Sequence, residues 1–483
     1  MIKPPSSFIY RILEDKLVQL IKDGVFKPGD RLPSLRQFSR QERVSVTTAI
    51  QTYGLLESRG YIQAKPQSGY FVRERNTQPP AEPSVSTLGG TVARGSVGNI
   101  INSVLQSSLN TDIAPFGAAT PGPELIPQRM LDRLLMAEIR QHDHRQGNSY
   151  PPGEYGLRRQ IARRSMDWGG QLDPEEIVVT TGGTQAIDLC IRAVTKPGDL
   201  VAVESPCYFG TLLLLKTLGL SILEIPSHPR DGLCLGALRE ALTAHPVRAC
   251  IASPCFSNPL GSCMSDAAKQ ELVEMLAMHT IPLIEDDIYG DLCHTEPRPR
   301  PAKAFDSQGL VMLCSSFSKI LAPEYRIGWT VPGRFREQVE WLQMTSVLAV
   351  PKIFQGTIAS FLESGAYDRH LRKLRISLAS QAARMIETIE AYFPSGTKVI
   401  RPRGGLVLWL ELPANSDAMH LSESALANGI SICPGPIFST TQQYRSYIRL
   451  NFGYPWSPCL EQATLKLGKL LQSEQLTHNY VSC

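Results

Sequence analysis

The stretch 311-VMLCSSFSKILAPEYRIGW-329 decides the fold of most of this 483-residue chain. It opens with an apolar run, 311–315, which is followed directly by Ser316, Ser318 and Lys319, with Arg326 seven residues beyond the lysine. A short apolar run bounded in this way is typical of a buried strand. Similar runs rich in branched side chains occur elsewhere, at 176–181, 200–204, 221–225, 249–253, 281–285 and 326–331.

Longer amphipathic stretches separate several of these runs and predict helices over 184–195, 209–218 and 266–278. Strands that alternate with helices predict an α/β fold with a mostly parallel, seven-stranded sheet covered on both faces. In such sheets ligands bind beyond the carboxyl ends of the strands. The polar residues that follow each run are therefore the candidates for a site.

These strand ends carry an unusual set of side chains. It comprises a glycine-rich helix start, an aromatic ring, an amide, a carboxylate, a phenol, two hydroxyls, a lysine and an arginine, at Gly183, Thr184, Tyr208, Asn258, Asp286, Tyr289, Ser316, Ser318, Lys319 and Arg326. Each residue alone has an ordinary structural explanation, such as a turn or a solvated surface. Together they match the needs of an aromatic phosphorylated aldehyde, pyridoxal 5′-phosphate (PLP), whose phosphate suits a helix N-terminus.

The N-terminal 75 residues follow a different pattern. Apolar spacing predicts helices over 7–23, after the capping residue Ser34, and again from Ser45. The third helix is expected to bury Val46, Ala49, Ile50, Tyr53 and Leu56 and to turn Thr47, Thr48 and Gln51 outward. A hairpin over 61–64 and 70–72 completes a winged helix-turn-helix.

Charge is also concentrated in this N-terminal part. Residues 1–75 hold 13 Lys/Arg and 7 Asp/Glu, a net of +6, so the remainder of the 49 basic and 45 acidic residues gives 36 against 38, a net of −2. A basic excess confined to one small domain favours a polyanionic partner such as DNA over a merely solvated surface.

The rest of the composition is ordinary. Hydrophobic residues make up 42% and charged residues 19% of the chain, which excludes a mostly disordered protein. No run is long enough to span a bilayer, the start lacks a signal peptide, and the 11 cysteines form no CxxC pair or zinc-spaced cluster. We therefore expect a cytoplasmic protein without a structural metal. The Pro- and Ser-containing segment 74–98 predicts a flexible linker.

The N-terminal motif "KPGDRLPSLRQFSRQERVSVTTAIQTYGLLESRGYI", with the wing "AKPQSGYFV", resembles the DNA-binding domain of GntR-type regulators. The resemblance implies contacts to double-stranded operator DNA from Arg36, Ser45, Thr47, Thr48, Ser68 and Gly69. Many relatives have an arginine where this chain has Val46, and another where it has Ile50. These two departures leave the operator sequence open.

The larger part resembles fold-type I aminotransferases of class I in about 375 residues. The matching segments include "SYPPGEYGLRRQI", "TTGGTQAI", "ESPCYFG", "SPCFSNPLG", "IEDDIYGDL", "RGGLVLWLEL" and "YIRLNF". With the N-terminal domain, the architecture resembles MocR-type regulators. It implies a DNA-binding domain over 1–73, a linker over 74–98 and a PLP domain over 99–483, in which the main sheet is joined by a smaller α+β part.

The same resemblance assigns roles at the site. Lys319 is expected to form the internal Schiff base, Asp286 to pair with the pyridine nitrogen, Asn258 and Tyr289 to bind the ring oxygen, and Tyr208 to stack on the ring. The expected phosphate ligands are Gly183, Thr184, Ser316, Ser318 and Arg326, with Tyr150 reaching the phosphate of the neighbouring subunit in a homodimer. Arg449 is expected to clamp the carboxylate of an amino acid, and Gly117 to lie over this substrate.

Two functions remain open from the sequence. The first is a transcription regulator that senses an amino acid or amine through its aminotransferase-like domain. The second is a metabolic aminotransferase that transfers an amino group to a 2-oxo acid, with a vestigial N-terminal domain. A purely structural scaffold would leave the PLP constellation unexplained.

Overall fold

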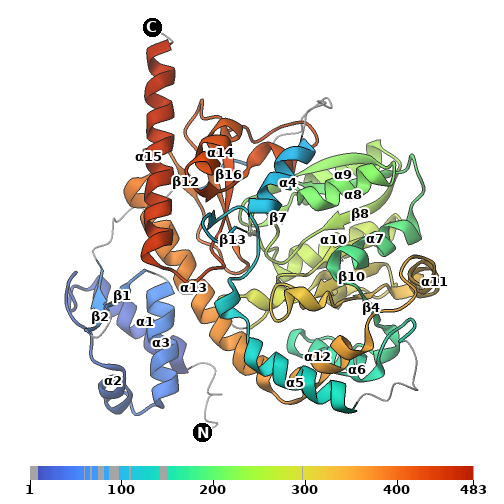
Figure 1. Ribbon diagram of the computed structural model, residues 1–483, viewed down its shortest axis with the longest axis horizontal. Helices are drawn as coiled ribbons and strands as arrows, with labels where there is room; N and C mark the ends of the chain where they lie inside the picture. Colours follow the sequence, from blue (N-terminus) through green and yellow to red (C-terminus); the bar gives the residue numbers. More distant parts are fainter. Residues whose placement is uncertain are drawn as a thin grey trace.

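The computed structural model describes residues 9–58, 60–65, 68–73, 81–85, 97–107, 110–141, 149–295 and 297–481. It contains a small N-terminal winged helix-turn-helix and a large α/β part (Figure 1). Within these described ranges no helix is long and apolar enough to cross a membrane.

The N-terminal domain has the order predicted from the sequence. It contains α1 (Ile9–Lys22), α2 (Leu35–Gln41), α3 (Val46–Ser58) and the antiparallel hairpin of β1 (Ile62–Lys65) and β2 (Gly69–Val72). Ser34 caps α2 by accepting from the Gln37 amide at 3.3 Å, and Ser45 Oγ accepts from the Thr48 amide at 3.0 Å at the start of α3. The capping residues predicted from the sequence are therefore confirmed.

The buried face of α3 differs from the prediction. Ala49, Tyr53 and Leu56 are fully buried as expected, but Val46 and Ile50 are 45% and 42% exposed. Thr52 takes the place in the core and donates its hydroxyl to the Thr48 carbonyl at 2.9 Å. The stripe at positions 49, 52, 53 and 56 has true helical spacing, and Val46 and Ile50 lie to one side of it.

The large sheet has eight strands in the order β4-β11-β10-β9-β8-β5-β6-β7. The first seven in this order correspond to the runs predicted from the sequence, and β11 runs antiparallel to both of its neighbours. The eighth, β7, has only two residues and was missed because so short a strand has no periodic signal. The bounds are β4 Val178–Thr180, β5 Leu200–Ser205, β6 Ser221–His228, β7 Gly232–Leu233, β8 Val247–Ala252, β9 Leu283–Asp286, β10 Val311–Ser316 and β11 Gly328–Val331.

Helices surround this sheet and buried side chains fill both of its faces. The predicted helices over 184–195, 209–218 and 266–278 are confirmed as α7 (Gly183–Val194), α8 (Phe209–Thr217) and α10 (Asp266–Met278). The other helices of this part are α4 Val97–Ser107, α5 Gln128–Gln141, α6 Tyr155–Ser165, α9 Leu235–Ala244, α11 Arg336–Ser346 and α12 Lys352–Glu363.

The smaller α+β part is built on a second sheet, in the order β12-β13-β16-β15, and on a parallel pair of β14 and β3. The strand bounds are β3 Ala114–Pro115, β12 Lys398–Val399, β13 Val407–Glu411, β14 Ile430–Ser431, β15 Cys433–Pro434 and β16 Tyr447–Asn451. Its helices are α13 Ala366–Tyr392, α14 Ala418–Ala427 and α15 Pro458–Val481.

One segment of the expected linker is bound to this second sheet. The Ala81 carbonyl accepts from the Val399 amide at 3.1 Å, and the Ser84 amide donates to Glu411 at 2.6 Å. Glu82 pairs with Arg230. Residues 81–85 therefore extend the large part of the protein instead of hanging free from it.

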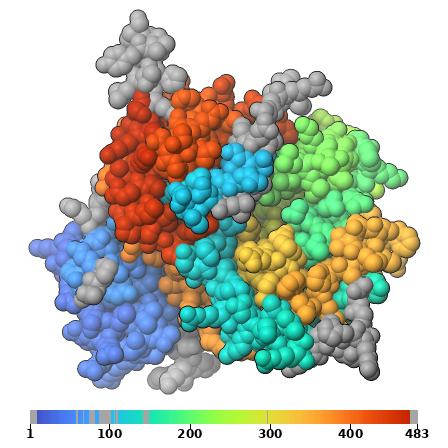
Figure 2. Space-filling view, viewed as in Figure 1, coloured from blue at the N-terminus to red at the C-terminus, as the bar shows by residue number. Residues whose placement is uncertain are grey.

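The N-terminal domain contacts the large part along α13. This 27-residue helix runs beside α3 (Figure 1), and the domain forms a separate lobe against it (Figure 2). The backbone of Gly54 in α3 approaches Ile376 so closely that an added Cβ would lie 3.6 Å from its Cγ2. Ion pairs join Arg73 to Glu387 and Glu57 to Arg384. These contacts cover the C-terminal half of α3.

Candidate functional site: a cofactor site at the carboxyl edge of the sheet

The predicted site residues converge at the carboxyl edge of the large sheet. Asp286 is the last residue of β9 and Ser316 the last of β10, and the two strands run parallel with Asp286 beside Cys314. Lys319 lies in the turn that follows β10, so its amine reaches the same edge as the carboxylate. The two charges interact, since the Lys319 ammonium opposes the protonation of Asp286.

The Lys319 amine is held where it loses its proton easily. Its Nζ donates to the Ala119 carbonyl at 2.7 Å. Burial, together with the positive charges of Arg449 and Arg326, lowers the pKa of Lys319 to about 8, although Asp286 acts in the opposite direction. A lysine of this kind is partly uncharged at neutral pH, which is the state required of an amine nucleophile.

The Asp286 carboxyl group is buried and forms no ion pair with any of the described residues. Burial and the neighbouring Asp287 raise the pKa of Asp286 to about 7, although the Ile288 amide, a donor at 3.2 Å, and the Lys319 ammonium act in the opposite direction. A buried acid in this condition favours a ligand that brings a donor or a positive charge to it. A protonated pyridine nitrogen is such a ligand.

Arg449, Asn258 and Tyr289 form one hydrogen-bonded group. Arg449 is 1% exposed and donates from Nη1 to Asn258 Oδ1 at 3.1 Å and from Nη2 to the Gly117 carbonyl. Asn258 also bonds Tyr289, which is 8% exposed and whose pKa is raised by burial. The Arg449 Nε has no hydrogen-bond partner among the described residues. An orphaned guanidinium N–H in a polar pocket suits a carboxylate ligand.

Tyr208 stands at the start of α8, where its ring is positioned by a glycine. A Cβ on Gly210 would lie 2.4 Å from Cε1 of Tyr208, so any larger residue at position 210 would displace the ring. Burial raises the pKa of Tyr208, and the charges of Arg449 and Asp286 both act on its hydroxyl. The Tyr208 side chain is therefore within electrostatic reach of both Asp286 and Arg449.

A cup for an anion forms at the start of α7. Gly182, with φ of +98°, precedes the helix, and Gly183 opens it with backbone N–H groups that have no partner within the helix. The Arg326 Nη1 donates to Ser318 Oγ at 3.1 Å, and Ser316 Oγ donates to the same hydroxyl at 2.9 Å. The helix dipole of α7, the Arg326 guanidinium and the two serine hydroxyls all favour the binding of a phosphate here.

The residues present fit PLP. Gly183 packs so closely against Ile288 that a Cβ there would lie 2.8 Å from Ile288 Cδ1, so a larger residue at this position would shift the start of the anion cup. The site also contains the anion cup at the start of α7, the Asp286 carboxyl group with its raised pKa and the Lys319 amine with its lowered pKa. These are the partners of the phosphate, the ring nitrogen and the aldehyde, respectively.

The predicted DNA-contacting residues lie on one part of the N-terminal domain. Arg36, Ser45 and Thr47 are exposed, and Thr48 is half-buried. Ser68 and Gly69 lie at the wing turn, where the Arg31 side chain packs so closely that a Cβ on Gly69 would lie 3.3 Å from its Nε. Ser45 and Thr47 are thus exposed at the start of α3, beside the exposed apolar side chains of Val46 and Ile50, and Ser68 is exposed at the wing.

Comparison with known proteins supports both halves of this arrangement. The family description "Aminotransferase class I and II" matches residues 125–455, and "Bacterial regulatory proteins, gntR family" matches residues 9–72. The chain is 38% identical over 465 residues to the uncharacterized HTH-type transcriptional regulator YdcR of Escherichia coli K12, covering 96% of this chain and 99% of the relative. The regulator YjiR of the same organism is 35% identical, covering 95% and 98%.

The chain belongs to the MocR-type family of transcriptional regulators. Solved structures similar to this MocR-type chain include LysN, the alpha-aminoadipate aminotransferase of Thermus thermophilus, complexed with N-(5'-phosphopyridoxyl)-L-leucine. That structure is 26% identical with a TM-score of 0.72 and covers 79% of this chain and 97% of its own.

Tyr150, predicted to reach the phosphate of the neighbouring subunit, lies on the surface of this chain. It is 55% exposed, and among the described residues it makes no hydrogen bond with the anion cup. The MocR-type chain by itself thus leaves this tyrosine on the surface.

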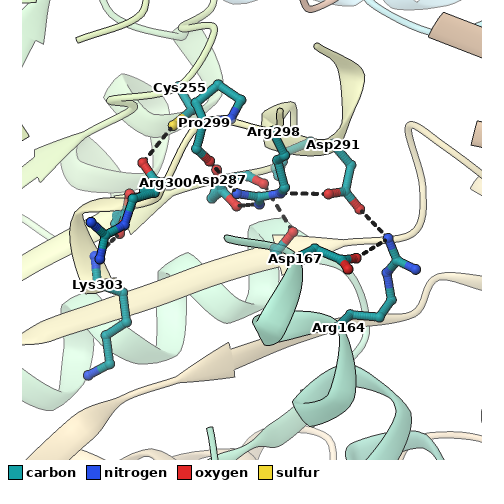
Figure 3. A network of polar contacts seen from close by, with 12 residues as sticks. Arg164, Asp167, Cys255, Asp287, Asp291, Arg298, Pro299, Arg300 and Lys303 are labelled. Carbon is teal, nitrogen blue, oxygen red and sulfur yellow. Dashed lines mark hydrogen bonds and ion pairs between the residues drawn. The ribbon is translucent and has the colours of Figure 1, made fainter. Parts of the chain in front are cut away.

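A buried ion network that has no signal in the sequence lies behind the site (Figure 3). Arg298 pairs with Asp287, which follows Asp286 in the chain, and its Nε lies 2.6 Å from Asp291 Oδ1. Burial opposes ionisation of Asp291, but Arg298 and Arg164 outweigh it and lower the pKa to about 2. The network holds the end of β9 in this MocR-type chain, and only tertiary structure brings its members together.

Glu204 is a second residue that the sequence analysis passed over. It ends the run 200–204, is 4% exposed, and burial raises its pKa to about 8, with Asp286 adding to the shift and hydrogen bonds from Ser253 opposing it. A charged residue inside an apolar strand was the available signal. Its carboxyl group lies within electrostatic reach of Asp286.

Proposed function

We propose that this protein is a PLP-dependent transcription regulator that binds operator DNA as a homodimer and senses an amino acid. The supporting observation is that Lys319 and Asp286 lie at the carboxyl edge of the large sheet and that Arg449, from β16 of the second sheet, acts electrostatically on Lys319. The same chain also carries a winged helix-turn-helix. The family relationship adds the regulatory role, and the domain from α1 to β2 supplies the DNA-binding surface.

When bound, PLP supplies an aldehyde that condenses with amines and a ring that withdraws electrons. Lys319 would contribute an uncharged amine, because its pKa near 8 leaves part of it deprotonated at neutral pH. Asp286 would accept a hydrogen bond from the ring nitrogen and keep it protonated. Asn258 and Tyr289 would bind the ring oxygen, and Tyr208 would cover one face of the ring.

Arg449 would select the ligand. Its unpartnered Nε and its two donors near Gly117 and Asn258 suit the α-carboxylate of an amino acid. An amino acid that displaces Lys319 also frees the Lys319 amine to return to the Ala119 carbonyl. For such binding to control transcription, the ligand must favour one arrangement of the DNA-binding domains over another.

The homodimer would complete each site. Tyr150 lies exposed on this chain, and in the dimer it would reach the phosphate cup of the neighbouring subunit. Exposed apolar side chains on α5 and α11, among them Met136 and Trp341 at 50% and 64% exposure, offer apolar surface for such an association. Sedimentation of Tyr150→Phe and wild type separates loss of the dimer from loss of the phosphate contact.

The decisive experiment combines spectroscopy with DNA binding. Protein loaded with PLP is titrated with amino acids while absorbance at the edge of the visible range is followed, and the same titration is repeated with selected operator DNA at fixed salt. A change in the spectrum together with a change in DNA affinity is expected. A ligand that alters the spectrum and leaves DNA affinity unchanged contradicts the sensing function.

A metabolic aminotransferase is the second candidate, because the set Lys319, Asp286, Tyr289 and Arg449 is intact. It requires multiple turnovers from an amino acid to a 2-oxo acid. The regulator requires only binding or a slow half-reaction. Counting product formed per bound PLP distinguishes the two functions.

A further inference from the structure

The first turn of α3 exposes branched apolar side chains at the place where polar residues were expected. Val46 is 45% exposed and Ile50 is 42% exposed. Residues four apart on a helix are neighbours on its surface, so the two side chains form one small apolar patch. Single exposed apolar residues are common on proteins, but a pair on the leading turn of the third helix of a helix-turn-helix occupies the surface that faces bases.

The nearby hydroxyls are already engaged. Ser45 Oγ accepts from the Thr48 amide at 3.0 Å and lies 2.8 Å from Thr48 Oγ1, with which it shares a hydrogen bond. Both side chains therefore serve the helix cap. At the start of α3 the exposed apolar side chains are those of Val46 and Ile50, and Thr47 is exposed beside them.

The surroundings of the patch point to a nucleic acid as its partner. Arg36, Arg40 and Arg43 are exposed, and none of them forms an ion pair with a described acidic residue. An apolar centre among unpaired cations complements a groove whose floor holds methyl groups and whose walls hold phosphates. The contact of α3 with α13 involves Gly54, one turn beyond Ile50, and the Val46 and Ile50 side chains are still 45% and 42% exposed.

We propose that Val46 and Ile50 read thymine in operator DNA through apolar contacts with its C5-methyl group. The proposal rests on the proposed DNA-binding function and adds the base class that this chain selects. Thymine is the base that presents an apolar group in the major groove, and neither side chain has a donor or acceptor with which to read guanine. The half-site therefore carries A·T pairs opposite the start of α3.

The test begins with the full-length protein and a library of random duplex DNA. Sequencing of the bound fraction gives a consensus, in which A·T pairs are expected at two positions of each half-site. Duplexes of that consensus are then made with uracil in place of thymine at these positions, which removes only the methyl group. Each substitution is expected to weaken binding about fourfold, the effect of losing one buried methyl contact.

Variants of the protein assign the effect to the two side chains. In Val46→Ala and Ile50→Ala, the ratio of the affinities for the thymine and uracil duplexes should fall toward one at the position that the altered side chain contacts. Ile12→Ala is the matched control, since Ile12 is a 61% exposed apolar residue on α1 and should leave the difference unchanged. Uracil placed outside the half-sites should also have no effect.

The outcomes separate this proposal from the function on which it rests. If no sequence is enriched at any salt concentration, the DNA-binding function itself fails. If a consensus is found with G·C pairs opposite the start of α3, or if uracil binds as well as thymine, DNA binding stands and the reading of methyl groups is wrong.

Discussion

The guanidinium of Arg326 lies directly over the backbone of Gly182, so closely that a Cβ on Gly182 would stand 2.6 Å from Nη2. Gly182 also has φ of +98°, which residues with side chains rarely adopt. We expect Gly182→Ala to displace Arg326 from the phosphate cup and to weaken PLP binding about 10- to 100-fold, the effect of one lost charged hydrogen bond. Fluorescence titration of the PLP-free protein measures it.

Gly156→Ala is the matched control for this change. Gly156 lies in α6, and a Cβ there meets no atom within 4 Å. Its replacement should leave PLP affinity unchanged and slightly favour the helix. Equal losses in both variants would mean that Arg326 does not depend on Gly182.

The pH dependence of PLP capture should follow the Lys319 amine. Because burial, Arg449 and Arg326 lower its pKa to about 8, the rate of covalent capture should rise with pH and level off above about 8. Arg449→Met removes one of the charges that lower this pKa, so the profile should move to higher pH. Arg445→Met alters a 79% exposed arginine just before β16, the strand that contains Arg449, and should leave the pH profile unchanged. Stopped-flow absorbance gives the rates.

Asp286 should lower the stability of the PLP-free protein at neutral and alkaline pH. Its folded pKa, about 7, lies above its ordinary value of 3.8, so the destabilisation grows as pH rises between these values and is complete above 7. Asp286→Asn should therefore stabilise the PLP-free protein at pH 8 by on the order of 3 kcal/mol, and by less toward about pH 5. Urea unfolding at the two pH values checks this, and the same variant should bind PLP more weakly.

The ion network behind the site should matter strongly for folding. Arg298→Met leaves Asp287 and Asp291 buried without their shared cation, which should cost about 3–5 kcal/mol of unfolding free energy. Arg239→Met breaks the exposed pair with Glu271 and should cost less than about 1 kcal/mol. Urea unfolding of both variants makes the comparison, and equal costs would contradict a structural role for the buried pair.

The site could be predicted from the sequence because its residues follow strands. Asp286, Ser316 and Lys319 lie at or just beyond strand ends, and parallel strands bring such ends to one edge without further information. The residues behind the edge could not be found in this way. Arg298 and Asp287 are eleven positions apart in a stretch without periodicity, and only the packed structure makes them partners.

Other differences have equally local causes. Val46 and Ile50 were assigned to the core because apolar residues usually define it, yet the stripe is completed by Thr52, whose hydroxyl is satisfied within the helix. Residues 81–85 have the composition of a linker, but their backbone groups find partners on the second sheet. The composition of a segment indicates whether it can fold by itself, but it does not show whether its backbone can form hydrogen bonds with a neighbouring sheet.

The hydrogen bond between Ala81 and Val399 leaves only a short connection between the large part and the DNA-binding domain. Arg73 ends the wing, and the difference 81 − 73 leaves eight peptide links, which reach at most ~30 Å whatever path they take. If the Arg73–Glu387 contact opens, Arg73 still stays within that distance of Ala81. The effective concentration of the N-terminal domain near α13 is then roughly millimolar. The short connection therefore keeps the N-terminal domain near α13, and in the proposed homodimer two such connections would limit how far apart the two half-sites of an operator can lie.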